Sequence, residues 1–108
     1  MAAADSITSM THRIVQKFDP ERIILFGSQA RGDAEANSDI DLLVVFSQLL
    51  DKRRMSVEIR RALAGFPVCK DIFVATPEEI ERRRNLVGDV VRFALREGKV
   101  IYERSQSA

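Results

Sequence analysis

The sequence has very little cysteine, because Cys69 is the single one among 108 residues. One cysteine cannot form an internal disulfide, which excludes a disulfide-rich secreted scaffold. Long apolar runs are also absent, and none approaches the roughly 18 residues that a membrane span needs. The opening MAAADSITSM lacks the basic and apolar segments of a signal peptide. We therefore expect a cytoplasmic protein that does not associate with a membrane.

An excess of charge of one sign is missing as well. The chain has 17 basic and 16 acidic residues, and its formal net charge is +1. This balance provides no overall attraction to nucleic acid, so direct nucleic-acid binding is not expected. The sequence contains no GxGxxG or Walker A string, which argues against dinucleotide and P-loop sites. Basic clusters at residues 52–54, 60–61 and 82–84 lie amid acidic residues, and we interpret them as solvated helix faces.

What the sequence does contain is an alternation of helical and extended patterns. Apolar spacing predicts helices over residues 7–18, 48–64 and 86–97, and a Thr-Pro-Glu-Glu cap predicts another after residue 76. Apolar runs predict strands over residues 22–26, 39–46 and 68–75, with an edge strand over 99–103. We predict an α/β (α+β) fold, a small mixed β-sheet with flanking helices, as a single domain over residues 1–108.

Three further expectations concern burial. In the helix over residues 86–97, we expect Leu86, Val90 and Phe93 to face inward. Cys69 lies in an apolar stretch and is expected to be a buried structural thiol, because cysteine often packs as a small apolar group. His12 is the single histidine, which makes neither a metal cluster nor a catalytic triad, so we expect it at the surface.

The first feature of a candidate site is Gly27-Ser28, which directly follows a predicted strand. Glycine lets the backbone turn sharply and lets a ligand approach closely. A short helix starting at Ser28 would direct free N–H groups at an anion. Taken alone, the pair is weak evidence for a site and fits a plain turn better.

The second feature is the pair Asp39 and Asp41 at the head of an otherwise apolar strand. Side chains alternate along a strand, so both carboxylates point to one face. Their mutual repulsion must be offset either by solvent or by divalent cations. Hard oxygen ligands of this kind suit magnesium or manganese, and the pair alone does not decide between the two explanations.

The third feature is Asp71, which lies inside the apolar run VCKDIFVA, although aspartate is disfavoured in strand interiors. Its neighbour Lys70 points to the opposite face and is a poor partner. If this strand lies beside the one that carries Asp39 and Asp41, the three carboxylates come together. Such a group opposite a phosphate-binding turn would form a two-metal site for nucleotidyl transfer.

The spacing of these residues resembles a known signature. Gly27-Ser28, ten intervening residues and Asp39-x-Asp41 match the GS-x10-D-x-D pattern of the DNA polymerase β nucleotidyltransferase superfamily. The strings GSQARG and SDIDLLV are similar to those of its minimal nucleotidyltransferase (MNT) branch. The similarity extends to VCKDIFVATPEEIE and EGKVIYER. The resemblance implies a polymerase β-like nucleotidyltransferase fold and a nucleoside triphosphate as substrate.

The resemblance also implies how the triphosphate is held. Gly27 and Ser28 would hold the β and γ phosphates of ATP. Arg31 occupies the arginine of the GSxARG string and would either contact phosphate or brace the loop through Asp33 or Glu35.

The resemblance further implies the roles of the carboxylates. Asp39 and Asp41 would bind two Mg²⁺ ions, with Mn²⁺ as the alternative metal. Asp71 would bind the catalytic metal and help the acceptor hydroxyl lose its proton. Positioning and charge stabilisation are most of what such a transfer needs from the protein.

A chain of this length leaves little surface for an acceptor, so we expect a partner chain. MNT proteins, which this chain resembles, are typically paired with a helical HEPN-type toxin, whose tyrosine receives AMP. The resemblance therefore implies a hetero-oligomer in which this chain is the antitoxin. Two alternatives stay open: a non-catalytic binding module that neutralises its partner by contact, and a nucleotidyltransferase subunit that acts on a small molecule. The three carboxylates favour an enzyme.

Overall fold

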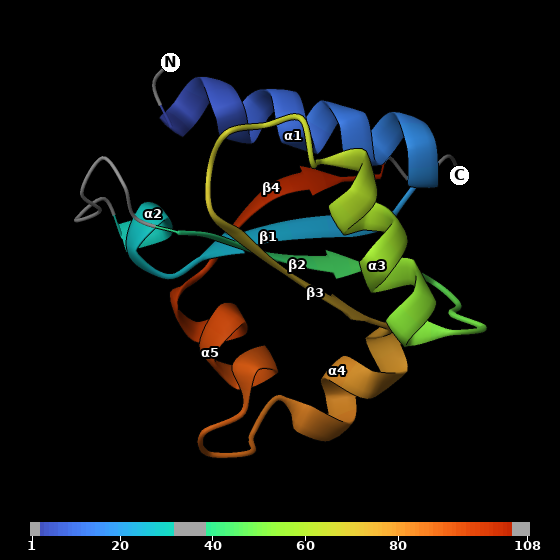
Figure 1. Ribbon diagram of the computed structural model, residues 1–108. Helices are drawn as coiled ribbons and strands as arrows, with labels where there is room; N and C mark the ends of the chain where they lie inside the picture. The colour runs from blue at the N-terminus through green and yellow to red at the C-terminus, as the bar shows by residue number, and fades with distance from the viewer. Residues whose placement is uncertain (1–2, 32–38, 105–108) are drawn as a thin grey trace.

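One mixed sheet organises the part of the chain that the computed structural model describes, residues 3–31 and 39–104. The strands are β1 (Arg22–Phe26), β2 (Ile40–Val45), β3 (Lys70–Ala75) and β4 (Lys99–Glu103), in the order β3-β2-β1-β4. The helices are α1 (Ala3–Phe18), α2 (Ser28–Arg31), α3 (Lys52–Ala62), α4 (Pro77–Arg83) and α5 (Val90–Glu97) (Figure 1). None of these helices has the length and apolar character to cross a membrane.

The strand directions bring the end of β1 and the starts of β2 and β3 to the same edge of the sheet. β1 pairs antiparallel with both β2 and β4, whereas β2 pairs parallel with β3. The first residues of β2 and β3 therefore lie side by side, and the last residue of β1, Phe26, pairs with Asp41 of β2. The turn that follows β1 is thus placed next to the start of β2.

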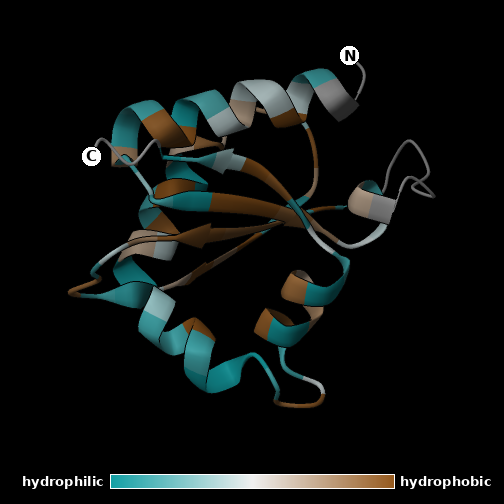
Figure 2. Ribbon diagram, turned by 180° about the vertical axis from the view of Figure 1, so that it is seen from behind, coloured by the Kyte–Doolittle hydropathy of each residue, from teal (hydrophilic) through white to brown (hydrophobic). Residues whose placement is uncertain are grey.

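Each face of the sheet is covered by a different pair of helices. α1 and α3 lie on one face, where Met10, Ile14 and Ile59 pack against alternate residues of the strands. α4 and α5 lie on the other face, where Ile80 and Val91 pack against the remaining set. The strands at the centre of the sheet are mostly hydrophobic, whereas the helices that cover them contain both hydrophilic and hydrophobic residues (Figure 2). The predicted mixed sheet with flanking helices is confirmed.

Capping residues determine where α3 and α4 begin, which the apolar pattern alone does not. α3 begins after Asp51, whose carboxylate accepts a hydrogen bond from the Arg54 N–H at 3.0 Å. α4 begins after Thr76, whose hydroxyl accepts from the Glu79 N–H at 3.2 Å, as the sequence predicted. Such a cap contributes about 1 kcal/mol.

The predicted inward face of the last helix is wrong for Leu86 and Phe93, whereas Val90 is partly buried and packs against the core as predicted. Asp89 caps α5 by accepting a hydrogen bond from the Val91 N–H, so the helix starts at Val90 rather than at Leu86. Leu86 therefore lies in the connection from α4 and is 52% exposed, and Phe93 is 43% exposed. The buried positions are Val91 and Ala94, one residue further along the helix than predicted.

The predicted burial of Cys69 is also wrong, because this thiol is exposed. β3 starts at Lys70 rather than at residue 68, so Cys69 lies just before the strand. Its carbonyl accepts a hydrogen bond from the Ile40 N–H at 2.9 Å, while its side chain stays outside the core. His12 is exposed, as expected.

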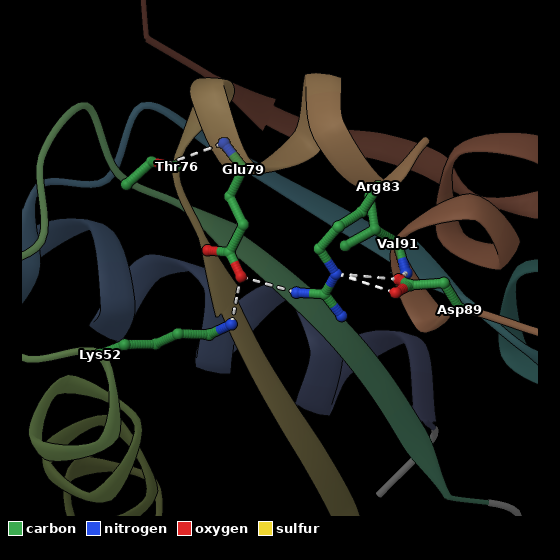
Figure 3. A network of polar contacts seen from close by, with 6 residues as sticks. All are labelled: Lys52, Thr76, Glu79, Arg83, Asp89 and Val91. Carbon is green, nitrogen blue, oxygen red and sulfur yellow. Dashed lines mark hydrogen bonds and ion pairs between the residues drawn. The ribbon is translucent and has the colours of Figure 1, made fainter. Parts of the chain in front are cut away.

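A network of charged side chains links the start of α3 to α4 and to the N-cap of α5 (Figure 3). Glu79 accepts hydrogen bonds from Lys52 and, at 2.7 Å, from Arg83. Arg83 also donates to both carboxylate oxygens of Asp89, at 2.9 and 3.1 Å. Each of these two carboxylates is less than one fifth exposed. The network therefore holds the three helices in fixed positions relative to one another.

The network should make stability fall in acid. Partial burial opposes ionisation of Glu79, but the hydrogen bonds from Lys52 and Arg83 hold its pKa below the ordinary 4.5. Contacts with Arg83 likewise hold the pKa of Asp89 below 3.8. A carboxyl with a lowered pKa stabilises the fold above its unfolded pKa, and this contribution is lost as the pH falls through the folded value.

We therefore expect Glu79→Gln to lower the free energy of unfolding by about 1–2 kcal/mol at pH 7. The difference from the parent should shrink as the pH falls below about 4.5 and through the lower pKa of Glu79 in the folded protein. Urea denaturation of both proteins between pH 3 and pH 7 measures it. Glu81→Gln is the control, because Glu81 is 70% exposed and pairs with Arg84 at the surface. A difference that does not change with pH would contradict this role of Glu79.

Candidate functional site

Asp41 and Asp71 lie on neighbouring strands at the same level of the sheet. They are direct partners in the parallel register between β2 and β3, where adjacent strands are about 4.8 Å apart. Alternation places both side chains on the face that α4 and α5 cover, together with Leu43 and Phe73. Asp39 is exposed and lies immediately before β2. The structure thus places β3 beside β2, the arrangement on which a shared site of these aspartates depends.

The charge of Asp41 is destabilised in this position. Burial raises its pKa above the ordinary 3.8, and the negative charges of Asp71 and Asp39 raise it further, as does a hydrogen bond with Asp71. All of these contributions raise the pKa, so no described cation offsets them. Within residues 3–31 and 39–104, no three acidic, histidine or cysteine side chains are already arranged as a metal-binding group.

The donor set suits a magnesium ion that arrives with a nucleotide. Magnesium is commonly held by one or two carboxylates together with substrate phosphate oxygens, rather than by an all-protein cage. Asp41 and Asp71 supply two carboxylates at one level of the sheet, and Asp39 supplies a third at its margin. A divalent cation here would relieve the repulsion that raises the pKa of Asp41.

Gly27 brings the turn after β1 into contact with the carboxylate of Asp41. Its φ is +77°, in the left-handed region that favours glycine. A Cβ at this position would lie 2.3 Å from Asp41 Oδ2, which is too close for any real contact. The left-handed φ and this close approach, which would force the carboxylate or the turn to move, both favour glycine here. α2 begins at the next residue, Ser28, which is partly buried. The helix predicted from Ser28 is confirmed, although it is only 4 residues long.

The candidate role of Arg31 concerns a side chain outside the described residues. Its backbone ends α2, but its side chain, together with Asp33 and Glu35, falls outside the part of the chain that the structure describes.

A cavity near Asp41 and Asp71 was not predicted from the sequence. It has a volume of about 440 Å³, and its lining includes Leu43, Phe73, Arg53 and Arg60. The basic clusters were interpreted as solvated faces, yet these two arginines line a concave surface. The spacing of Arg53, Val57 and Arg60 at intervals of four and three residues on one helix could have indicated this.

Comparisons with known proteins agree with this architecture. The chain matches the nucleotidyltransferase domain family over residues 9–101, whereas no curated protein matches it. A structure from Sulfolobus solfataricus that is assigned as a nucleotidyltransferase is 22% identical, with a TM-score of 0.64, over 93% of this chain and 79% of that chain.

Two further solved structures share the fold. One is assigned as a minimal nucleotidyltransferase and is 27% identical, with a TM-score of 0.53, over 92% of this chain and 95% of that chain. The other is a toxin–antitoxin crystallised with AMP-PNP, 20% identical, with a TM-score of 0.54, over 94% of this chain and 74% of that chain. The fold that the sequence resemblance implied is confirmed.

Proposed function

Because the chain belongs to the nucleotidyltransferase domain family, we propose that it transfers AMP from ATP to a hydroxyl group of a partner protein. The observation that carries the proposal is the direct pairing of Asp41 with Asp71 beside the turn at Gly27. Two carboxylates from different strands at one level of the sheet support a shared site for one phosphate chain.

The carboxylates have distinct roles in the proposed reaction. Asp39 and Asp41 would hold two divalent ions, Mg²⁺ or Mn²⁺, which would neutralise the phosphate charge and favour loss of the hydroxyl proton. Asp71 contributes to the second of these positions and takes up the proton of the acceptor hydroxyl. The hydroxyl oxygen bonds to the α phosphorus, the bond from that phosphorus to the bridging oxygen breaks, and pyrophosphate leaves.

The turn after β1 holds the other end of the nucleotide. Gly27 and Ser28 lie beside the carboxylates because Phe26 pairs with Asp41, and we assign them to the β and γ phosphates. Arg31, at the end of α2, is the remaining candidate for a phosphate contact.

A partner with an acceptor hydroxyl completes the proposal. The toxin–antitoxin crystallised with AMP-PNP has the same fold, which supports an antitoxin role for this chain. We propose a helical HEPN-type toxin as partner and one of its tyrosines as acceptor, in a hetero-oligomer. A binding module that acts by contact alone, or a subunit that modifies a small molecule, would instead leave such a tyrosine unmodified.

ATP should bind tightly only when magnesium is present. The three clustered aspartates repel the triphosphate, and a divalent cation converts this repulsion into attraction. We expect calorimetry to show at least about tenfold weaker ATP binding in EDTA than in magnesium, equivalent to ~1.4 kcal/mol. AMP, which lacks the β and γ phosphates, is the control ligand and should bind weakly in both. Equal ATP affinity with and without magnesium would refute a metal-bridged site.

A further inference from the structure

We propose that the cavity between α3 and the pair α4–α5 binds an extended acidic segment of the protein that carries the acceptor hydroxyl. The proposal rests on the proposed function, because it identifies the surface through which that acceptor reaches the same site. Its evidence is the position of the cavity, the free edge of β3 and the charges at the rim.

The cavity lies on the Asp71 side of the carboxylate pair. Leu43 and Phe73 line it, and each follows its aspartate by two residues on the same face of the sheet. At about 3.3 Å per residue, this places the cavity roughly 7 Å from the carboxylates. The turn at Gly27 lies across the sheet, after β1. A nucleotide held by that turn leaves the β3 side open to the acceptor.

The edge of β3 offers backbone groups to an extended chain. β3 is the first strand of the sheet order and has β2 on one side only. The carbonyl of Cys69 accepts a hydrogen bond from the Ile40 N–H, and the carbonyl of Ala75 accepts one from the Phe46 N–H, so both point toward β2. Carbonyl directions alternate along a strand, so those of Ile72 and Val74 point away from β2, into the cavity that both residues line. Such an edge can pair with a segment of another protein.

A hydrogen bond from Arg60 confirms that the carbonyl of Ile72 points away from β2. The Nη2 atom of Arg60 donates to this carbonyl at 3.4 Å, from α3 across the cavity. This is a long hydrogen bond, and an incoming peptide N–H could replace it. The arginine would then be available to a carboxylate of the bound segment.

The rim of the cavity carries a local excess of positive charge. Lys52 and Arg83 line the cavity, but Glu79 and Asp89 pair with them (Figure 3). Arg53 and Arg60 also line it. Neither of these two forms a salt bridge with any described carboxylate.

An apolar surface lies between the two unpaired arginines. Val57 lines the cavity on the same helix and is 42% exposed. An apolar surface bounded by uncompensated cations fits a segment that has both acidic and aromatic side chains.

Binding can be measured with a defined probe in the absence of nucleotide. The probe is a fluorescently labelled random copolymer of glutamate and tyrosine, followed by anisotropy. We expect the parent chain to bind it and the double variant Arg53→Glu, Arg60→Glu to bind at least about tenfold more weakly. The matched control is Arg54→Glu, Arg61→Glu, which makes the same charge change on the same helix, at two arginines that line the neighbouring depression but not the cavity. It should stay within about threefold of the parent.

Two further readouts separate docking from folding and from catalysis. Arg53→Glu alone preserves the contact of Arg60 with Ile72, and it should still weaken probe binding measurably. The probe should also slow hydrogen exchange at the Ile72 and Val74 amides in the parent. Equal weakening in the two double variants, or unchanged exchange at both amides, would overturn the proposal. ATP affinity in magnesium should be unchanged in both double variants, so a failed nucleotide site would appear separately, as absent ATP binding by the parent.

Discussion

Asp71→Asn should lower AMP transfer at least ~100-fold, the lower range for loss of a group that assists proton removal. Asparagine keeps the volume of the side chain but removes its charge, so it neither accepts the acceptor proton nor favours a second cation beside Asp41. In the proposed site, ATP would arrive with its own cation, held mainly by phosphates and by Asp39 and Asp41. Its affinity should therefore stay within about tenfold of the parent, or ~1.4 kcal/mol.

Asp41→Asn is the informative comparison. Asp41 touches the turn at Gly27 and pairs with Asp71, so its loss should weaken ATP binding and transfer together. Calorimetry and single-turnover transfer to the partner measure the two quantities on each variant. If Asp71→Asn transfers AMP at close to the parental rate, Asp71 is a structural carboxylate and the third ligand lies elsewhere. Neutralisation of the partner by an inactive variant would instead favour action by contact.

Gly27→Ala should disturb the site through the turn that follows β1. The added Cβ would lie 2.3 Å from Asp41 Oδ2, so either the carboxylate or the turn must move. Displacement of a reacting group by about 1 Å commonly lowers rates ~100-fold, and we expect at least this loss of transfer. The left-handed φ of +77° adds strain, and the free energy of unfolding should fall by about 1–3 kcal/mol. Transfer kinetics and urea denaturation test the two effects.

Gly65→Ala is the matched control for this substitution. A Cβ added at Gly65 would meet no heavy atom within 4 Å, and this glycine lies outside the left-handed region. Its replacement should leave both transfer and stability close to those of the parent. A Gly27→Ala protein with parental activity would mean that Asp41 can move freely without loss of function.

The sequence predicted the strands well because each is bounded by a sharp change of pattern. The runs at residues 22–26 and 99–103 coincide with β1 and β4. Residues 39–46 and 68–75 exceed β2 and β3 by one or two positions. The helices were less certain at their starts, since apolar spacing does not show which polar residue acts as the cap. Asp89 illustrates this, because its capping bond to Val91 moved the buried face away from Phe93.

The candidate site was also predicted only in part. Its carboxylates were proposed from the sequence, whereas the contacts between distant segments were not. Residue type and spacing pointed to Asp39, Asp41 and Asp71, because carboxylates in an apolar strand need a reason to be there. The steric conflict at Gly27 and the cavity beside Phe73 were not predicted, since both arise from segments that are distant in sequence. Glu79 was expected to close a capping box with Thr76. Its carboxylate instead pairs with Lys52 and Arg83, because tertiary neighbours supply stronger partners than the backbone N–H.

The parallel pairing of β2 with β3 has a consequence for how the protein folds. Parallel strands cannot be joined by a tight hairpin, and the chain must pass through α3 before β3 can dock. Asp41 and Asp71 therefore meet only after a long loop has closed, a slow step compared with formation of individual helices. In a refolding experiment, transferase activity should return after most of the helical circular-dichroism signal, with the docking of β3.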